Sequence, residues 1–259
     1  MTTEDKRLCV SFNDVESGND GDTCISCITH SLLKDLSGSA VCIDVGADIG
    51  WWGLFCKYVN DKAHVYAFEP NPTSFSILSK RSSDTFNVFN SAVSDREGDI
   101  HMDFQGSNSN SRGNTGTLVK KMKLDFIFDS VDTVKLIKID TEGHDIIIVT
   151  SLEPFFSRIN TIIFEFTVYW NGSDHNDCIK KSIEALELVY NRYPYVYIAS
   201  RRSFPPKLCR ITDIDNLMPI CVLLMQISLQ VDIVCSMSPI PSIEVTKDTD
   251  FLEDFMIVL

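Results

Sequence analysis

Basic residues are scarce in this chain, in which 23 lysines and arginines stand against 36 aspartates and glutamates among 259 residues. The formal net charge is therefore −13. An acidic surface repels phosphate backbones and anionic headgroups, which disfavours non-specific binding to nucleic acid or to a membrane surface. The basic segment 120–123 is the strongest local exception, and we interpret it as a solvated face beside a turn. We expect no nucleic-acid partner.

The sequence also lacks an uninterrupted apolar run that could cross a bilayer. Its most apolar stretch, 217–236, contains Pro219, Gln226, Gln230 and Asp232, so we interpret it as a buried helix followed by a buried strand. The first residues carry no apolar signal region. The nine cysteines are scattered without a framework spacing, which is typical of a reducing compartment. We expect a cytoplasmic protein without a membrane span.

Short β-rich runs alternate with helix-like runs after residue 38. The run 40–45 is apolar almost throughout, as in a strand that is buried on both faces. The alternation predicts an α/β fold with a mostly parallel twisted sheet and helices on both faces. The expected strands are 40–45, 64–69, 86–92, 134–140, 161–166, 195–199 and 231–236, and the expected helices are 23–36, 49–58, one from residue 70, 143–152 and 177–190.

Composition divides the chain into three predicted parts. Residues 1–37 form an N-terminal helical extension, 38–238 form the main domain, and 239–259 form an acidic C-terminal tail. Within the main domain, a hairpin strand at 99–104 is followed by a polar loop at 106–116. Loops of this length in compact domains are often lids or binding loops, and disorder is the alternative.

The first expected strand leads into a turn that combines glycines with acids, Asp44-Val-Gly46-Ala47-Asp48-Ile-Gly50. Glycines at a strand-to-helix turn let the backbone approach a ligand closely, and the following helix presents free N–H groups. The turn lacks the middle glycine of a dinucleotide-binding motif, and its carboxylates would repel a pyrophosphate. They suit the positive sulfonium and ammonium groups of S-adenosylmethionine. The alternative is a glycine turn that serves packing alone.

Glu69 ends the second expected strand, about twenty residues beyond this turn, where an acid can accept both hydroxyls of a ribose. Pro70 and Asn71 continue that wall of the site. The segment that begins with Ser91 and Ala92 and runs to residue 95 is placed to flank the adenine. Together these residues predict a binding site for S-adenosylmethionine.

The fourth expected strand ends in an unusual concentration of charge. Lys138 and Asp140 lie two residues apart and so point to one face of a strand that should be buried. Glu142 and His144 follow at once, and charge at the carboxyl end of a parallel strand marks the ligand crevice. We interpret Lys138, Asp140, Glu142 and His144 as the catalytic end of the site, with His144 or Asp140 as general base. The alternative is an ion pair followed by a helix cap.

The same carboxylates are the ligands that Mg²⁺ prefers. Glu165 ends the fifth expected strand on the crevice side. A divalent cation held by Asp140, Glu142 or Glu165 is therefore an additional hypothesis, which the sequence leaves open.

Ordered blocks of the sequence resemble the FkbM family of methyltransferases. They are residues 43–50, 67–72, 92–95 with Gly98, 136–145 and 162–165. The resemblance implies a Rossmann-like class I methyltransferase fold and O-methylation, often of a hydroxyl on a sugar or natural product. This chain has Asp48 where the family usually has Asn, and Asp145 where it usually has Glu.

We therefore expect an S-adenosylmethionine-dependent O-methyltransferase that acts on a sugar, a glycan or a small natural product. The alternatives are a methyltransferase for RNA or protein, a nucleotide-binding oxidoreductase, and an inactive fold used as an interaction module. Trp51 and Trp52 either line the acceptor pocket or pack the first helix.

Overall fold

The computed structural model describes residues 23–105, 108–111, 116–166, 175–199, 207–216, 219, 231–241 and 243–247. The helix predicted at the start of 217–236 lies outside these ranges. The described residues group into two compact units, one within Leu36–Glu165 and one drawn from Met1–Asp35 and Phe166–Leu259. The predicted division into an extension, a main domain and a tail stays a prediction.

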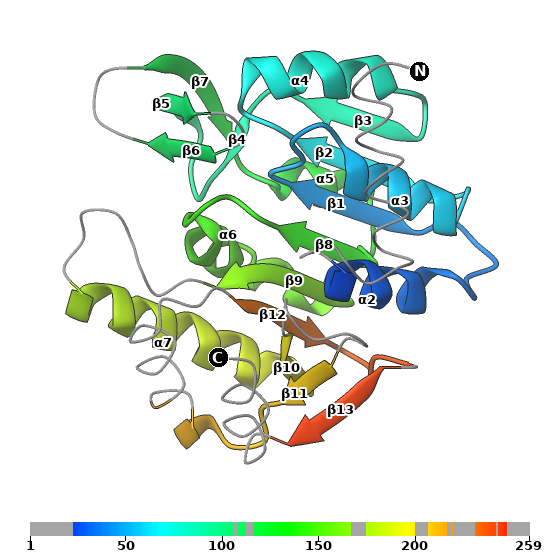
Figure 1. The fold of residues 1–259 in the computed structure, drawn as a ribbon, viewed down its shortest axis with the longest axis vertical. Helices are drawn as coiled ribbons and strands as arrows, with labels where there is room; N and C mark the ends of the chain where they lie inside the picture. Colours follow the sequence, from blue (N-terminus) through cyan, green and yellow to red (C-terminus); the bar gives the residue numbers. More distant parts are fainter. Residues whose placement is uncertain are drawn as a thin grey trace. The chain divides into compact units, whose positions relative to one another are not determined.

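The unit within Leu36–Glu165 is built on five parallel strands in the order β9-β8-β1-β2-β3 (Figure 1). Strands β8 and β9 are buried throughout and β1 nearly so, as their apolar runs predict. The predicted parallel sheet is confirmed. The strands are β1 (Val41–Val45), β2 (His64–Phe68), β3 (Phe86–Phe89), β8 (Leu136–Ile139) and β9 (Thr161–Phe166), and the helices are α3 (Trp51–Val59), α4 (Pro72–Leu78), α5 (Asp125–Ser130) and α6 (Asp145–Ser151).

Helices cover both faces of this sheet, as predicted. A Cβ on Gly53 of α3 would lie only 2.8 Å from the Phe86 ring, so α3 packs tightly on the face that bears Phe86. Successive side chains of a strand point to opposite faces, so Phe89 lies on the other face. There the Phe126 ring of α5 meets it edge-on, with 5.6 Å between ring centroids. Trp52 of α3 is fully buried, which favours packing of the helix over a place in an acceptor pocket.

Two sequence predictions fail beside this sheet. The third strand ends at Phe89 instead of residue 92, because the Asn90 side chain turns back to donate to the backbone carbonyls of Glu69 and Pro70. The predicted loop 106–116 is partly regular, since four of its residues form a strand paired with β5. Its role as a lid stays a prediction. The second sheet has the order β4-β7-β5-β6, with β4 (Ala92–Val93), β5 (Gly98–Gln105), β6 (Asn108–Ser111) and β7 (Thr117–Met122).

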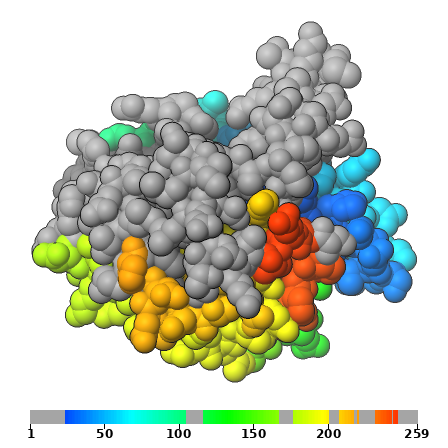
Figure 2. Space-filling view, turned by 60° about the horizontal axis from the view of Figure 1, so that its bottom comes forward, coloured from blue at the N-terminus to red at the C-terminus, as the bar shows by residue number. Residues whose placement is uncertain are grey.

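The other unit contains strands in the order β12-β10-β11-β13. Strand β10 is antiparallel to both of its neighbours, and β13 runs parallel to β11. Edge strand β13 lies at the surface in Figure 2, where it is red, and its Val245 is exposed. No helix in the described ranges is both long and apolar enough to cross a membrane. The elements are α2 (Thr23–Leu33), α7 (His175–Arg192), β10 (Tyr195–Ala199), β11 (Lys207–Arg210), β12 (Val231–Ser236) and β13 (Glu244–Lys247).

Replacing Gly53 with alanine tests the packing of α3. The added methyl group would meet the buried Phe86 ring at 2.8 Å and the Val65 side chain at 3.1 Å. Overpacking of this kind costs about 1–3 kcal/mol, against about 1 kcal/mol gained from helix propensity. We expect Gly53→Ala to lower the free energy of unfolding by about 1 kcal/mol in urea denaturation. Gly38→Ala is the control, because no atom lies within 4 Å of its added Cβ. Equal stability of both variants would contradict the packing.

Candidate functional site

The order of the parallel strands reverses between β1 and β8. From β1 the chain proceeds through β2 to β3 on one side, and from β8 it proceeds to β9 on the other. Ligands of α/β sheets bind beyond the carboxyl ends of the strands at such a reversal. Here the two strands stay close past their ends, because the Asp140 N–H donates to the Val45 carbonyl at 2.9 Å. The glycine turn and the charged segment therefore meet at one edge of the sheet.

The turn after β1 has a shape that requires glycine. Gly46 has a φ of 79°, and a Cβ added to it would lie 1.8 Å from the Asp140 carbonyl oxygen. Gly50 has a φ of 88° and precedes α3 directly. The N–H groups of Gly46 and Ala47 both donate to the Phe68 carbonyl, at 3.0 Å. These bonds fix the turn against β2, and close packing on the Asp140 backbone at Gly46 and on the Leu78 side chain at Gly50 leaves no room for a Cβ there.

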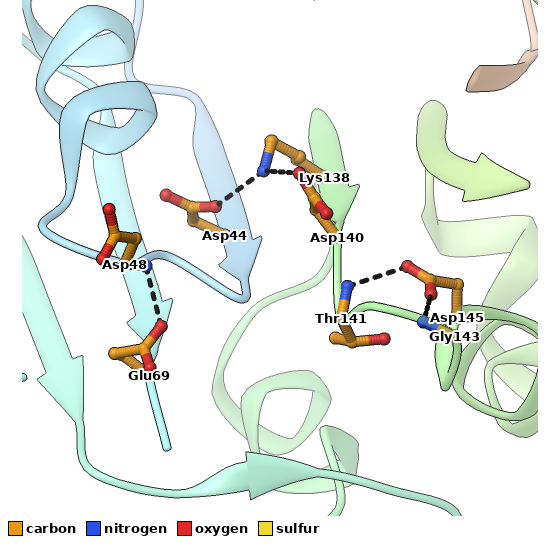
Figure 3. Close-up of polar contacts among 8 residues, drawn as sticks. All are labelled: Asp44, Asp48, Glu69, Lys138, Asp140, Thr141, Gly143 and Asp145. Carbon is orange, nitrogen blue, oxygen red and sulfur yellow. Dashed lines mark hydrogen bonds and ion pairs between the residues drawn. The ribbon is translucent and has the colours of Figure 1, made fainter. Parts of the chain in front are cut away.

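The Glu69 carboxylate is held rigidly at the end of β2. One of its oxygens accepts the Asp48 N–H at 2.8 Å, and the other accepts the Asn71 N–H at 2.7 Å (Figure 3 shows the Asp48 contact). Asp48 adopts a left-handed φ of 46°, which such a bond helps to hold. Asn71 also caps α4, because its side chain accepts the Thr73 N–H at 2.9 Å. Each carboxylate oxygen keeps a further lone pair for a ligand.

Burial raises the pKa of Glu69 to about 7. The two backbone N–H donors lower the pKa, whereas the nearby carboxylates of Asp48 and Asp44 raise it, but desolvation is the largest effect. A ligand that donates hydrogen bonds to this carboxylate would favour the ionised form.

Two supporting residues of this region were missed in the sequence. Asn90 ties the end of β3 to the backbone of Glu69 and Pro70, with donor–acceptor distances of 2.8 and 3.2 Å. Ser74 of α4 donates to the Asp48 carboxylate at 2.7 Å. A polar residue next to the apolar Val88 and Phe89 was the available signal for Asn90. Ser74 lies inside a helix, where hydroxyls are common, so no signal distinguished it.

The buried ammonium of Lys138 lies between two carboxylates (Figure 3). It is 3.2 Å from the nearer oxygen of Asp140 and 4.0 Å from that of Asp44, and only 3% of the lysine is exposed. Asp44 and Lys138 are register partners on neighbouring parallel strands, which places their side chains on one face. The ion pair between Lys138 and Asp140 that the sequence offered as an alternative is therefore present.

Asp44 is fully buried, and neither of its carboxylate oxygens meets the geometry of a hydrogen bond within the described chain. Desolvation raises its pKa to about 6, although Lys138 and the nearby Gly53 N–H both lower it. Buried polar atoms are almost always hydrogen-bonded. An acidic group that lacks such bonds at the ligand-binding edge fits a ligand that brings its own donors.

The loop after β8 is shaped by Asp145. Its two carboxylate oxygens accept the backbone N–H groups of Thr141 and Gly143, at 3.0 and 3.1 Å (Figure 3). This closes a tight loop in which Glu142 has a φ of 56° and Gly143 a φ of 108°. Burial, followed by repulsion from Asp140, raises the pKa of Asp145 to about 6. The short aspartate side chain thus serves the loop backbone, and Glu142 is exposed.

His144 follows this loop and contacts a strand end of the second sheet. Its Nε2 lies 3.2 Å from the Ser94 hydroxyl, which donates to the Asp95 carboxylate at 3.0 Å. Burial lowers the pKa of His144, and the charges of Lys121 and Arg96 lower it further against the opposing effect of Asp95. The imidazole is therefore neutral near pH 7, which is the form that can accept a proton.

The residues expected at the adenine make hydrogen bonds within the chain. Ser94 and Asp95 face His144, and the Ser91 hydroxyl donates to the Met122 sulfur at 2.8 Å. Contact of Ser91 and Ala92 with a cofactor stays a prediction.

The divalent-cation hypothesis gains no support. Asp140 and Glu142 follow β8, and the buried Glu165 lies near the end of β9. No group of three or more histidines, cysteines or acids within the described residues is arranged to hold a metal ion. A role for Asp140, Glu142 or Glu165 as metal ligands stays a prediction.

The chain is similar in sequence to known methyltransferases. The family model for the methyltransferase FkbM domain matches residues 44–186, more than half of the chain. The hexuronic acid methyltransferase AglP of Haloferax volcanii is 29% identical over 167 residues, covering 61% of this chain and 67% of the relative. Human methyltransferase-like protein 13 in complex with SAH has a TM-score of 0.43 and 12% identity, covering 90% of this chain and 87% of that one. M. capricolum TrmK with S-adenosyl-homocysteine has a TM-score of 0.40 and 12% identity, covering 84% and 69%.

The raised pKa of Glu69 predicts a pH-dependent stability. An unfolded glutamate titrates near about 4.3, so the proton that Glu69 holds up to about pH 7 stabilises the folded state at low pH. That contribution, of order 1–3 kcal/mol, is lost as the pH rises through about 7. We expect Glu69→Gln, which cannot ionise, to lose less stability than the wild type between about pH 5 and about pH 8. Urea denaturation at both pH values measures the free energy of unfolding, and an equal loss of stability in the wild type and in Glu69→Gln would contradict the raised pKa.

Proposed function

The chain belongs to the FkbM methyltransferase family, and we propose that it is an S-adenosylmethionine-dependent O-methyltransferase that acts on a sugar hydroxyl. The observation that carries the proposal is the Glu69 carboxylate. It is buried at the end of β2, aligned by two backbone N–H groups, and has free lone pairs on both oxygens. This is the arrangement that accepts the two hydroxyls of a ribose.

The rest of the cradle fits the same cofactor. Gly46 and Gly50 supply the positive φ angles that shape the turn, and the buried Asp44 offers acceptors for an ammonium group. The carboxylates favour a cationic ligand over a pyrophosphate, which disfavours the oxidoreductase alternative. When bound, S-adenosylmethionine supplies a methyl group on a positively charged sulfur. Asp44, Gly46, Gly50 and Glu69 would hold it, with Ser91 and Ala92 toward the adenine.

His144 is the proposed general base. Its imidazole is neutral and only partly buried, so it can accept the proton of the acceptor hydroxyl as that oxygen forms its bond to the methyl carbon. The Asp140 carboxylate is instead paired with the Lys138 ammonium at 3.2 Å. The site also accelerates the reaction by binding the methyl donor and the acceptor hydroxyl in the correct orientation. The proton then leaves the imidazole to solvent.

The charges beside His144 favour an acidic acceptor. Lys121 on β7 is half-buried and lies between the small residues Ala92 of β4 and Gly98 of β5 in the strand register. Its ammonium and the Arg96 guanidinium both lower the pKa of His144. This end of the site therefore carries positive charge, although the chain as a whole is strongly acidic. Positive charge at this end suits the carboxylate of a uronic acid, which is the substrate named for the relative AglP. RNA and protein acceptors, and an interaction module, are not favoured, and a cytoplasmic location stays a prediction.

Removing the Glu69 side chain tests the cofactor site. Two hydrogen bonds to a charged group are worth about 1.5–3 kcal/mol each. We expect Glu69→Ala to weaken S-adenosylmethionine binding by at least about tenfold in calorimetry. Glu187→Ala on the exposed side of α7 is the control and should bind normally. If the Glu69→Ala variant binds S-adenosylmethionine with unchanged affinity, Glu69 does not bind the ribose hydroxyls.

Removing the His144 imidazole tests the base. We expect His144→Ala to lower kcat by about 10²–10⁴-fold while the affinity for S-adenosylmethionine is kept. His64→Ala is the matched control, because it removes a histidine at the opposite, amino-terminal end of β2. Methylation by His144→Ala at the normal rate would show that another group takes the proton.

Neutralising Lys121 tests the acceptor class. We expect Lys121→Gln to raise KM about tenfold for an acceptor with a uronic acid, through loss of a charge-assisted contact, and to leave KM for the matching neutral sugar unchanged. Lys120→Gln is the control, since adjacent strand residues point to opposite faces. Equal effects of Lys121→Gln on both acceptors would exclude recognition of the carboxylate.

A further inference from the structure

The contacts of His144 determine which of its two ring nitrogens carries the proton in the neutral form. Its Nε2 lies 3.2 Å from the Ser94 hydroxyl oxygen. That hydroxyl has one proton, and it donates this proton to the Asp95 carboxylate at 3.0 Å. The side of the serine oxygen that faces His144 is then a lone pair, which can only accept a hydrogen bond.

The direction of the first bond follows from charge. The Asp95 carboxylate is ionised near neutral pH: desolvation raises its pKa, but the Ser94 hydroxyl, the Arg96 guanidinium and further contacts together lower it below its usual value. Arg96 lies 3.4 Å from the Asp95 oxygen that accepts from Ser94. An ionised carboxylate is a stronger acceptor than a neutral imidazole nitrogen. The serine proton therefore belongs on the side of Asp95.

We propose that Ser94 and Asp95 are positioning residues that keep the proton of neutral His144 on Nε2, so that Nδ1 is the nitrogen that takes the acceptor proton. The assignment of the proton rests on the contacts alone, and its catalytic consequence rests on the proposed function. In the step itself, the acceptor O–H bond breaks, its proton joins Nδ1, and the oxygen electron pair forms the bond to the methyl carbon. The sulfur keeps the electron pair of the bond that breaks.

The same contacts stabilise the protonated ring. When Nδ1 is protonated, Nε2–H still donates to Ser94, and the negative charge of Asp95 favours the imidazolium. Lys121 and Arg96 act against it, which keeps the ring neutral before the reaction. The two effects are therefore separate. Ser94 sets the orientation and tautomer of the His144 ring, and the charges of Asp95, Lys121 and Arg96 set the balance between its neutral and protonated forms.

Long-range ¹H–¹⁵N correlation spectra of the labelled full chain read this tautomer directly. The chain has five histidines, so His144→Ala identifies the signal of His144. We expect the wild type to show the Nε2–H form, Ser94→Ala to show a mixture of both forms, and Ser94→Thr to restore the Nε2–H form. Ser151→Ala is the control, because it removes a hydroxyl bond to the Ile148 carbonyl within α6 and should leave the tautomer unchanged. An Nδ1–H form in the wild type, or no change in Ser94→Ala, would overturn the proposal.

Kinetics of the same variants measure the catalytic consequence. We expect Ser94→Ala to lower kcat roughly tenfold with KM for both substrates unchanged, and Ser94→Thr to recover most of the rate. Loss of kcat in Ser94→Ala that Ser94→Thr does not restore would overturn the positioning role. If the spectra show the expected tautomer but His144→Ala methylates normally, the proton assignment stands and the proposed base fails. The two failures are therefore distinguishable.

Discussion

The buried ammonium of Lys138 is the interaction on which the rest of the site depends. Its positive charge reduces the repulsion between the carboxylates of Asp44 and Asp140, which lie at the ends of neighbouring strands. Removing one partner of a buried ion pair typically costs about 3–5 kcal/mol, because the remaining charges are left uncompensated. With Lys138 in place, β1 and β8 can end side by side, and the Gly46 backbone can lie against the Asp140 carbonyl. The proposed cofactor cradle therefore depends on this buried lysine.

Two strained backbone conformations lie close to Lys138 and its carboxylate partners, and other carboxylates stabilise them. Asp48 and Glu142 are the residues other than glycine with positive φ in the described chain, and they follow the ends of β1 and β8. Such conformations cost about 1–3 kcal/mol each and persist only where the surroundings enforce them. Glu69 holds the Asp48 N–H, and Asp145 holds the N–H groups on either side of Glu142. The acids therefore shape the backbone as well as offer charge to a ligand. This accounts for a short aspartate at position 145.

Much of this site could be predicted because parallel strands place their carboxyl ends at one edge. Apolar runs located the five strands, and the acids after them followed from position alone. Strand β3 was predicted too long, since the run 86–92 does not show that Asn90 bonds back to Glu69. Strand β6 was missed because Asn108–Ser111 lacks apolar residues and is defined by pairing with β5. The contact of Ser94 with His144 joins residues fifty positions apart, and no local pattern encodes it.

The central claim is that Glu69 and the glycine turn hold S-adenosylmethionine. A crystal structure of the chain with S-adenosylhomocysteine tests it most directly. We expect both ribose hydroxyls to lie within about 2.5–3.0 Å of the two Glu69 carboxylate oxygens. We also expect the amino-acid end of the ligand to lie beside Gly46 and Asp44. A ligand bound elsewhere, or a ribose that leaves Glu69 in contact with water alone, would contradict this claim.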